Sequence, residues 1–384
     1  MRVVHVCAYF APAFVYGGPP RSVLGLCRAE REAGIDVRVV TTTANGDSEL
    51  DDSASHAVDY AGIPVRYCAR SRPRRLFYAP TLHDAVSAEL QHADVLHIHG
   101  LWNAAVWTAA TAARQLRKPY VLSPRGMLTP AALMHHRWRK KLAFSVADRR
   151  VVRHAARLHA TSAPECQALN CIPEPGRAVF VPNGIDLDPV VQNDGSIRRQ
   201  LNASDNAPFV LFLGRIHPIK RLDLLAEAFG IVIAQHPTAQ LVIAGPDEQG
   251  HRATVEPLFA SYSNSVTWIG KVDDTVKRQL LDAADVLVMC SNSESFGMSV
   301  AEAMAVGTPV VVTRTCPWPD VESHATGYWV EQTRESIAGA ITTLLANPDI
   351  ADEMGQRGKA LIASRYTWQH AAAALIHEYE AIAR

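Results

Sequence analysis

The sequence predicts an α/β protein made of two consecutive Rossmann-like domains, each with a parallel sheet. Short apolar runs of strand type alternate with amphipathic segments of helical length, and this alternation restarts in the second half of the chain. The 384 residues exceed the usual size of one domain. A hydrophobic content of 48% and a charged content of 20% are typical of a globular protein with an ample core.

The first half begins with an apolar run that is too short for a signal peptide and better interpreted as a strand. Strands are expected at residues 3–7, 37–41, 95–99, 120–123, 157–161 and 178–181. Helices are expected at residues 21–33, 82–91 and 104–116, and the polar residues 45–58 are expected to form a mobile loop.

The alternation is interrupted at Pro182-Asn183-Gly184, and the polar run 192–206 follows. We therefore expect an N-terminal domain of residues 1–185 and a C-terminal domain of residues 186–366. Strands of the second half are expected at residues 209–213, 241–244, 266–269, 286–290 and 309–313. Helices are expected near residues 221–235, 274–283, 298–306, 333–346 and 349–363, and a last amphipathic helix at residues 368–383.

Charge is distributed unevenly although the net charge is zero. Residues 1–187 carry 23 Lys and Arg against 15 Asp and Glu, a net charge of +8, and residues 188–384 carry the reverse, −8. Two halves of opposite net charge are consistent with a cleft between two domains, or with a basic face turned towards an anionic surface. The seven cysteines include no C-x-x-C and several lie in apolar runs. We interpret them as reduced, which favours a cytoplasmic location.

The stretch SNSESFGMSVAEAMAVGTPVV (291–311) combines a strand end, a polar loop and a helix that Gly307 ends. Glu294 lies in the loop and Glu302 about one turn into the helix. Phosphate binds well at such a helix start, where backbone N–H groups are unpaired, and here these belong to Ser295, Phe296, Gly297 and Met298. Because carboxylates repel phosphate, we expect both Glu residues to accept hydrogen bonds from hydroxyl groups. The pattern predicts a nucleotide or sugar-phosphate site; the alternative is a plain helix with an acidic first turn.

The segment GRIHPIK (214–220) directly follows the first strand of the second half. Arg215 and Lys220 are therefore expected over the carboxyl edge of the sheet, where the helix after Glu294 also begins. The planar fork of Arg and the point charge of Lys both suit a pyrophosphate. A solvated basic turn is the alternative, and the coincidence with Glu294 and Glu302 at one edge weighs against it.

Two features of the first half lie at its expected carboxyl edge. Gly17 and Gly18 occupy the first β-to-α loop, where paired glycines let a ligand approach the backbone closely, although a plain turn is the alternative. His97 and His99 alternate on one strand; His99 ends it and could make a polar contact or handle a proton, whereas His97 is expected in the core. No G-x-G-x-x-G or Walker A sequence is present, so a nicotinamide fingerprint is lacking.

Metal binding is not expected from these patterns. We find no further ligand at suitable spacing near His97 and His99. Asp186-Leu187-Asp188 imitates a D-x-D metal motif, but it follows a turn at the domain boundary, and we interpret it as structural.

The segment 137–157 carries eight Lys and Arg against one acid, Asp148, with Trp138 and Phe144 among them. A basic helix with aromatic residues is typical of an element attracted to anionic lipid. A merely solvated face is the alternative. Nothing else supports a nucleic-acid patch, so no nucleic-acid partner is expected.

Together these residues resemble family four of the retaining glycosyltransferases, which has the GT-B fold. The resemblance covers nearly the whole chain. Its motifs are E-x7-E (Glu294 to Glu302) followed by AMAVGTPVV, G-R-x-x-x-x-K (Gly214, Arg215, Lys220), Pro182-Asn183-Gly184, the Gly17-Gly18 loop and HIHGLW. SPRGML (123–128) before a basic segment is similar to bacterial members that build surface polysaccharides.

The resemblance implies a role for each matching residue. Arg215 and Lys220 would bind the donor diphosphate and stabilise it as it leaves. Glu302 would hold the ribose hydroxyls, and Glu294 would fix the transferred sugar together with the N–H groups of residues 296–298. The other implied contacts are Gly18 with phosphate, His99 with the sugar or acceptor, and Lys271 and Val272 with the base.

The implied function is transfer of a hexose, with retention, from a nucleotide-diphosphate sugar to a saccharide or lipid-linked saccharide in bacterial polysaccharide biosynthesis. Such an enzyme would need no metal or other cofactor, and would be cytoplasmic with possible contact to an anionic membrane through 137–157. Its last helix, 367–384, would pack back on the N-terminal domain. The alternatives are a sugar-nucleotide epimerase, a phosphorylase, or a non-catalytic partner that binds nucleotide or carbohydrate.

Overall fold

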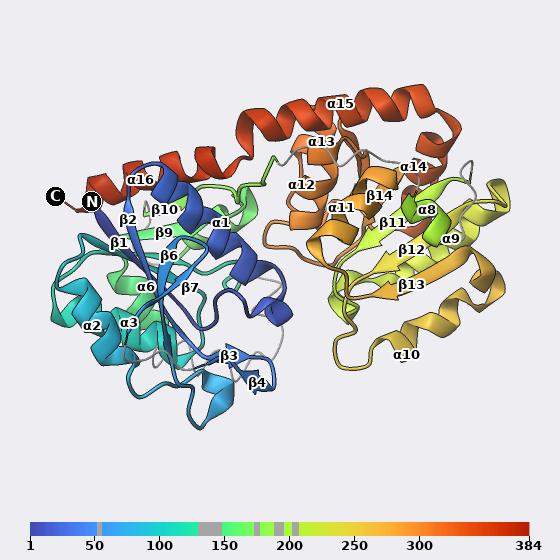
Figure 1. Cartoon of the computed structure of the whole chain (residues 1–384). Coiled ribbons are helices and arrows are strands. Elements are labelled where there is room, and N and C mark those ends of the chain that lie inside the picture. Colours follow the sequence, from blue (N-terminus) through green and yellow to red (C-terminus); the bar gives the residue numbers. More distant parts are fainter. Residues whose placement is uncertain (52–55, 130–147, 173–176, 188–195, 202–206, 384) are drawn as a thin grey trace. The chain divides into compact units, whose positions relative to one another are not determined.

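The computed structural model describes residues 1–51, 56–129, 148–172, 177–187, 196–201 and 207–383. The chain forms two compact units: Met1–Asp186 with Trp368–Arg384, and Leu187–Thr367. Each unit has its own sheet of mainly parallel strands between helices (Figure 1). The predicted α/β class is therefore confirmed.

The sheet of the first unit has eight strands in the order β10-β9-β8-β7-β1-β2-β6-β5. Its strands are β1 (Arg2–Cys7), β2 (Asp36–Thr42), β5 (Val58–Tyr60), β6 (Ile63–Cys68), β7 (Val95–His99), β8 (Tyr120–Ser123), β9 (Arg157–Ala160) and β10 (Ala178–Phe180). All neighbours are parallel except β5 and β6. The strand order reverses between β1 and β7, and ligands of such sheets bind outside the carboxyl ends of the strands at this switch point.

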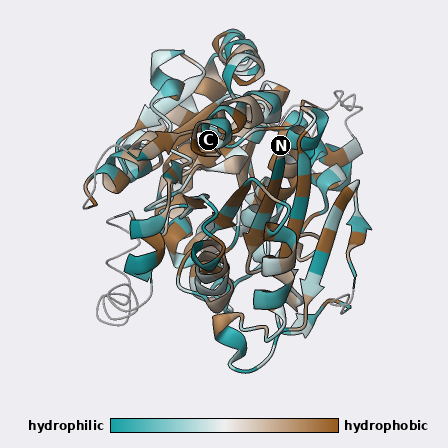
Figure 2. Cartoon of the chain, turned by 90° about the vertical axis from the view of Figure 1, so that its left-hand side faces the viewer, coloured by the Kyte–Doolittle hydropathy of each residue, from teal (hydrophilic) through white to brown (hydrophobic). Residues whose placement is uncertain are grey.

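Side-chain alternation along β1 separates the two layers of this unit. Val4 and Val6 belong to a hydrophobic cluster with α2 (Leu82–Leu90) and α3 (Ala104–Gln115), whereas Cys7 belongs to a cluster with α1 (Gly18–Glu32). In Figure 2, hydrophobic residues follow the inner strands and hydrophilic residues cover much of the outer helical faces. The short helices α6 (Arg149–His154) and α7 (Ala163–Asn170) complete this part of the chain.

The C-terminal helix α16 (Trp368–Ile382) belongs to the first unit, where it packs against α1. Trp368 packs closely against the backbone at two glycines, Gly25 and Gly184. A methyl group added to Gly25 would come within 2.3 Å of the Trp368 ring, and one added to Gly184 would come within 2.3 Å of the Trp368 backbone. Both positions therefore have to lack a side chain for α16 to sit where it does.

The second unit has an all-parallel sheet in the order β13-β12-β11-β14-β15-β16. Its strands are β11 (Phe209–Leu213), β12 (Gln240–Ala244), β13 (Val266–Gly270), β14 (Val286–Met289), β15 (Val310–Thr313) and β16 (Gly327–Val330). Its helices are α8 (Ser196–Gln200), α9 (Leu222–Gln235), α10 (Arg252–Val255), α11 (Asp274–Ala283), α12 (Met298–Val306), α13 (Asp320–Ser323), α14 (Arg334–Ala346) and α15 (Pro348–Arg365). The order reverses between β11 and β14, so the switch point of this sheet lies there.

Several elements differ from the sequence-based expectation. The strands β5, β6 and β16 and the helices α7, α8, α10 and α13 were not predicted. Part of the expected loop 45–58 is ordered by pairing of β3 (Ala44–Asn45) with β4 (Ser48–Glu49). Arg70 holds this small hairpin through its bond to the Glu49 carboxylate at 2.9 Å and to the Gly46 carbonyl at 3.0 Å. Among the described residues, no helix has the length and hydropathy needed to cross a membrane.

Candidate functional site

The switch point of the second sheet gathers the two segments that the sequence analysis singles out. Residues 214–220 leave β11 and residues 290–297 leave β14, and these strands are neighbours although they are far apart in the sequence. Side chains from both loops therefore meet at one carboxyl edge.

Lys220 and Glu294 form an ion pair at this edge. Lys220 ends the short 3-10 helix Pro218–Lys220, in which His217 Nδ1 accepts the Ile219 N–H at 3.1 Å. The side chains of Lys220 and Glu294 are only 11% and 14% exposed. Removal from water strengthens their mutual attraction. The pair brings together a cation and a hydrogen-bond acceptor that the sequence analysis assigns to phosphate and sugar.

Arg215 lies on the more open side of the same loop. Its Nη1 is 2.5 Å from Glu248 Oε2, and its side chain is 43% exposed. The loop is held by a close backbone approach: a methyl group on Gly245 would lie 1.9 Å from the Gly214 carbonyl oxygen, and Gly245 has a φ of +148°. The Ile216 N–H donates to the Pro246 carbonyl at 2.9 Å. Gly245 therefore sets the position from which Arg215 projects.

The loop before α12 has the predicted form of a helix start. Gly297 is its N-cap with a φ of +88°, and Gly307 ends the helix with a φ of +90°, as predicted. Phe296 is buried against Trp318, with ring centroids 5.0 Å apart, and this contact anchors the loop. The backbone N–H groups of Met298 and Ser299 have no acceptor within the helix and can bind an anion, whereas the Val300 N–H donates to the Gly297 carbonyl at 3.0 Å.

Glu302 is on α12 and is paired with Lys277 of α11. Lys277 Nζ lies 2.8 Å from Glu302 Oε1 and 3.2 Å from Asp274 Oδ1. Lys277 was not predicted; its only signal in the sequence is its place one turn into the helix after Lys271-Val272. It supplies a further cation near the carboxyl edge of this sheet.

The remaining predicted donor contacts lie at the carboxyl edges as well. Lys271 and Val272 follow β13, which is separated from β11 by β12. In the first unit Gly17 is the N-cap of α1 with a φ of +80°, and Gly18 is the first residue of that helix. Pro19 and Pro20 come next and carry no N–H. The Gly18 N–H is therefore the main backbone donor that the start of this helix can offer to an anion.

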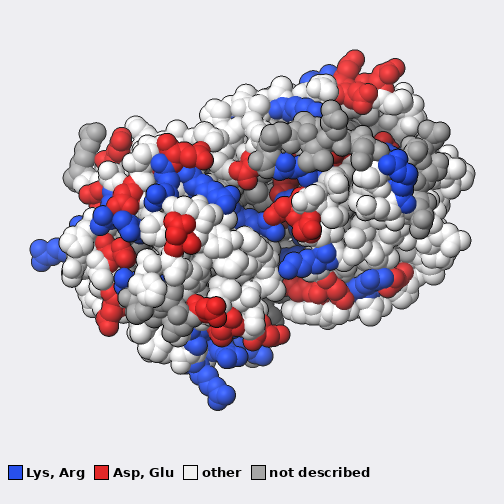
Figure 3. Space-filling model, in the orientation of Figure 1, with Lys and Arg blue, Asp and Glu red and all other residues white. Residues whose placement is uncertain are grey.

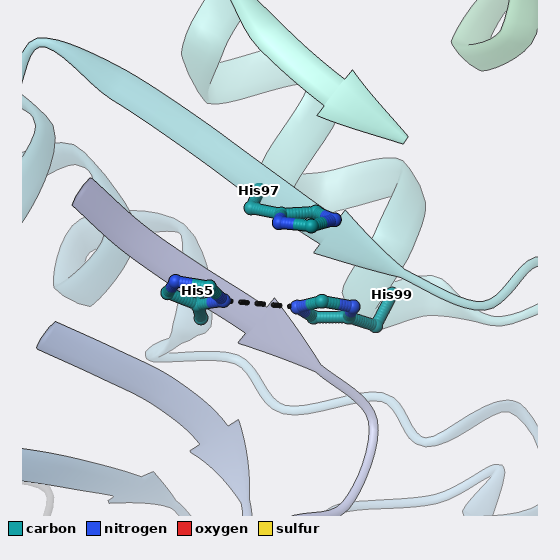
Figure 4. A group of neighbouring side chains, drawn as sticks. All are labelled: His5, His97 and His99. Atoms are coloured by element: carbon teal, nitrogen blue, oxygen red, sulfur yellow. Dashed lines mark hydrogen bonds between the residues drawn. The ribbon is translucent and has the colours of Figure 1, made fainter. Parts of the chain in front are cut away.

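His99 ends β7 and lies in a cluster of buried imidazoles (Figure 4). Its Nε2 is 3.0 Å from Nδ1 of His5 on the neighbouring strand β1, and its Nδ1 is 3.2 Å from Nη2 of Arg125. Burial, together with His97 and Arg125, lowers the pKa of His99 well below its usual range. His99 is therefore neutral at pH 7 and has both ring nitrogens engaged within the protein.

Three imidazoles, those of His5, His97 and His99, place nitrogen atoms within 4.8 Å of one another. Residue spacing alone predicts no third ligand here, but the parallel register of β1 and β7 pairs His5 with His97 and supplies one. Binding a metal would nevertheless break existing hydrogen bonds, because His97 Nδ1 and Nε2 are each 2.6 Å from a hydroxyl, of Tyr379 and Ser123. The group is built for hydrogen bonding among its own members.

The basic segment 137–157 is described only from Asp148 onward, so residues 137–147 lie outside the described part. Asp148 is buried and its Oδ1 accepts from the Trp102 N–H at 3.0 Å and from Trp107 Nε1 at 2.9 Å. On the face drawn in Figure 3, acidic and basic side chains are interspersed over both units, so the opposite net charges of the two halves form no uniform patches there.

Two protein families match the chain, one in each half. The family described as "Glycosyl transferase 4-like domain" matches residues 17–184, and "Glycosyl transferases group 1" matches residues 193–361. The chain belongs to glycosyltransferase family four. The predicted family, the GT-B fold and the enzyme class, a hexosyltransferase, are thereby confirmed.

Relatives of this glycosyltransferase span its whole length. A D-inositol 3-phosphate glycosyltransferase of Geodermatophilus obscurus is 28% identical over 96% of this chain and 85% of its own. A phosphatidyl-myo-inositol mannosyltransferase of Mycobacterium leprae is 28% identical over 100% of this chain and 97% of its own. Among solved structures, the sucrose-phosphate synthase of Thermosynechococcus elongatus superposes with a TM-score of 0.81 at 23% identity, covering 99% and 98%. Anabaena HepE in complex with UDP-glucose superposes with a TM-score of 0.77 at 19% sequence identity, and the superposition covers 99% of this chain and 100% of HepE.

Proposed function

We propose that this glycosyltransferase transfers a hexose from a nucleoside-diphosphate sugar to a saccharide acceptor, with retention of configuration. The observation that supports it best is the set of charged groups around the switch point of the second sheet. Lys220 and Arg215 follow one strand, and Glu294 and the start of α12 follow its neighbour. Cations and unpaired N–H groups suit a diphosphate, and carboxylates suit sugar hydroxyls.

Each of these cations is paired with a carboxylate in the chain itself, which suggests how the donor would bind. A diphosphate carries more charge than Glu294 and would compete with it for the Lys220 ammonium group. The released Glu294 carboxylate could then accept hydrogen bonds from the hydroxyl groups of the transferred sugar. The same exchange applies to Arg215 and Glu248. Binding of the diphosphate would thereby prepare the acceptor groups for the sugar.

The chemical step would proceed on one face of the sugar. The acceptor oxygen forms a bond to the anomeric carbon while the bond from that carbon to the diphosphate oxygen breaks, and the acceptor proton passes to the leaving diphosphate. Negative charge grows on the leaving group, and Lys220 and Arg215 would stabilise it. No carboxylate nucleophile is needed in this scheme, and none is assigned.

Metal-independent catalysis is part of the proposal. Two side-chain cations and the N-terminal end of α12 would supply the positive charge that a divalent ion supplies elsewhere. Activity should therefore persist in EDTA.

The acceptor is proposed to bind to the first unit, at the switch point between β1 and β7. A lipid-linked saccharide in bacterial polysaccharide synthesis, reached from the cytoplasmic side, is our first candidate, with 137–157 contacting anionic lipid. Relatives named for inositol phosphates favour a second candidate, a phosphorylated or lipid-linked inositol. Both candidates are polyols that carry an anionic group.

Donor choice can be tested by thermal shift with UDP, GDP, ADP and CMP, each with and without EDTA. A nucleotide at about 100 times its dissociation constant adds about 2.7 kcal/mol of stability, which should raise the melting temperature by a few degrees. One EDTA-insensitive nucleotide is the expected result. The sugar nucleotides of that base are then offered with D-inositol 3-phosphate or a lipid-linked saccharide, and the anomeric configuration of the product is read by NMR.

The same assays separate the alternatives. An epimerase would convert its sugar nucleotide without acceptor, and a non-catalytic partner would bind the donor and never consume it. Flotation with anionic vesicles at low and high salt tests the membrane contact; binding that salt does not weaken would contradict its electrostatic basis.

A further inference from the structure

A continuous chain of polar groups crosses the interior of the first unit, between the carboxyl end of its sheet and the helices α1 and α16. It begins at the Arg125 guanidinium and ends at the Val181 carbonyl. The closest approaches, in order, are Arg125 Nη2–His99 Nδ1 3.2 Å, His99 Nε2–His5 Nδ1 3.0 Å, His5 Nε2–Glu30 Oε2 2.7 Å, Glu30 Oε1–Tyr379 Oη 2.8 Å, Tyr379 Oη–His97 Nδ1 2.6 Å, His97 Nε2–Ser123 Oγ 2.6 Å, Ser123 Oγ–His159 Nδ1 2.6 Å and His159 Nε2–Val181 O 2.8 Å.

The two ends of this chain fix the direction of its hydrogen bonds. Arg125 can only donate, and the Val181 carbonyl can only accept. A neutral imidazole donates from one nitrogen and accepts at the other, and a hydroxyl has one hydrogen. The position of each hydrogen can therefore be worked out from both ends towards the middle.

From the Arg125 end, His99 Nδ1 must accept, so its hydrogen is on Nε2 and is donated to His5 Nδ1. The hydrogen of His5 is then on Nε2, facing Glu30 Oε2. These two atoms are 2.7 Å apart, although the N–H direction is off the line to the oxygen. We infer that a small rotation of the His5 ring or of the Glu30 carboxyl group directs this hydrogen at Glu30 Oε2, because two lone pairs would repel at that separation.

From the Val181 end, His159 must donate from Nε2, so its Nδ1 accepts the hydroxyl hydrogen of Ser123. Ser123 in turn accepts from His97 Nε2. A neutral His97 then needs a donor at Nδ1, which is the Tyr379 hydroxyl. Tyr379 has no second hydrogen for Glu30 Oε1, so a hydrogen at that contact has to come from Glu30.

We propose that Glu30 is a neutral carboxylic acid in the folded protein, so that every hydrogen bond of the chain points from Arg125 towards Val181, and that Glu30 and Tyr379 act through this chain as positioning residues for Arg125. Glu30 is fully buried, and among the described residues no Lys or Arg nitrogen lies within 4.0 Å of its carboxyl group. An ionised carboxylate there would be costly.

Two other arrangements satisfy the same contacts: an ionised Glu30 with the extra proton on His97, or an ionised Glu30 with the extra proton on His159. Burial, followed by the influence of the other imidazoles and of Arg125, lowers the pKa of His97 well below its usual range. Burial also lowers the pKa of His159 to about 4. A cationic ring at either place is therefore disfavoured, and the proton belongs on Glu30.

The consequence concerns Arg125, which follows β8 at the carboxyl edge. Its Nη1 donates to Ser22 Oγ at 2.8 Å, in the first turns of α1. The neutral groups of this chain orient the guanidinium but do not neutralise its positive charge. Glu165 attracts the guanidinium electrostatically, but the two groups are too far apart to form an ion pair. We infer that a cation held in this way at the carboxyl edge, and bonded to the helix that begins at Gly18, attracts an anionic group of a substrate.

The protonation states can be measured without any substrate. In the whole protein with ¹⁵N-labelled histidine, NMR at pH 7 should show His5, His97, His99 and His159 neutral, each with its hydrogen on Nε2. A ring of His97 or His159 with both nitrogens protonated would overturn the proposal. Because this NMR experiment needs neither a nucleotide-sugar substrate nor turnover, its outcome is independent of the proposed function.

Three variants test the positioning role, and this arm rests on the proposed function. Glu30→Gln keeps both contacts, since its amide can donate to Tyr379 and accept from His5, and should retain near wild-type transfer and tautomers. Tyr379→Phe removes two bonds and should reduce transfer about tenfold or more, as should Arg125→Gln. A Glu30→Gln variant that changes the tautomers, or a Tyr379→Phe variant with unaltered tautomers and rate, would refute the assignment.

Discussion

Lys220 and Glu294 form a nearly buried ion pair across the switch point of the second sheet, although 74 positions separate them in the chain. Neither charge has another ion-pair partner among the described residues. A ligand that binds Lys220 therefore releases Glu294, and both groups can serve one substrate.

Replacement of Lys220 by Ala should reduce kcat by about 10²–10³-fold, because the cation that faces the leaving diphosphate is lost. Steady-state transfer with a saturating acceptor measures the effect. Arg334→Ala removes a cation from an exposed pair with Glu335 and should leave the rate unchanged. Near wild-type kcat in Lys220→Ala would remove Lys220 from the site.

Glu302→Ala should weaken binding of the nucleoside diphosphate about tenfold or more, since hydrogen bonds to a charged acceptor contribute about 1.5–3 kcal/mol. Binding of inorganic pyrophosphate should not weaken, because it has no ribose and Glu302 no longer competes with it for Lys277. Calorimetric titration of both ligands gives the comparison, with the exposed Glu353→Ala as control. Equal losses for the two ligands would contradict a ribose contact.

Gly245→Ala should displace the loop that carries Arg215, because the added methyl group would lie 1.9 Å from the Gly214 carbonyl oxygen. We expect weaker nucleotide binding together with a lower melting temperature. Gly250→Ala is the matched control: its φ is also positive, at +73°, but nothing lies within 4 Å of the added group. Its free energy of unfolding should fall by only about 1 kcal/mol, from the unfavourable backbone conformation, and it should bind nucleotide normally.

The free energy of unfolding should fall as the pH falls from about 6.5 to about 4. Burial lowers the pKa of His159 from 6.5 to about 4, so in this window the unfolded chain binds a proton that the folded protein does not. The loss from His159 alone amounts to about 3 kcal/mol at its lower end. His97 and His99 act in the same direction, whereas the proton that we propose on Glu30 offsets part of the loss, because the folded protein then holds a proton that the unfolded chain releases. Urea unfolding at pH 7 and pH 5 measures it. His159→Gln should flatten the dependence and exposed His92→Gln should not; greater stability at pH 5 would contradict the prediction.

Local sequence patterns were sufficient for the elements that carry the second-unit site. The helix of 298–306, its stop at Gly307 and the placement of 214–220 after a strand all follow from neighbouring residues. The strand β6 contains Pro64 and Arg66, and β16 has only four residues, so neither shows a clear periodic pattern.

Contacts set by strand register and helix packing could not be read from the sequence. His5 meets His97 and His99 only because β1 and β7 pair in parallel, and Tyr379 reaches them from the far end of the chain. Lys277 meets Glu302 through the packing of α11 on α12. No local spacing encodes such neighbours, so the sequence identified candidate groups but not the partners that hold them.

The position of α16 has a consequence for biosynthesis. Residues 1–186 leave the ribosome before Trp368 and Tyr379 have been made, since the whole second unit lies between them in the chain. Domains generally fold as they emerge, N-terminal part first. Here the nascent first unit would present the Gly25 and Gly184 surface and the polar groups around Glu30 uncovered. It can close only after synthesis has passed residue 382, so it is the unit most exposed to chaperones and proteases while translation continues.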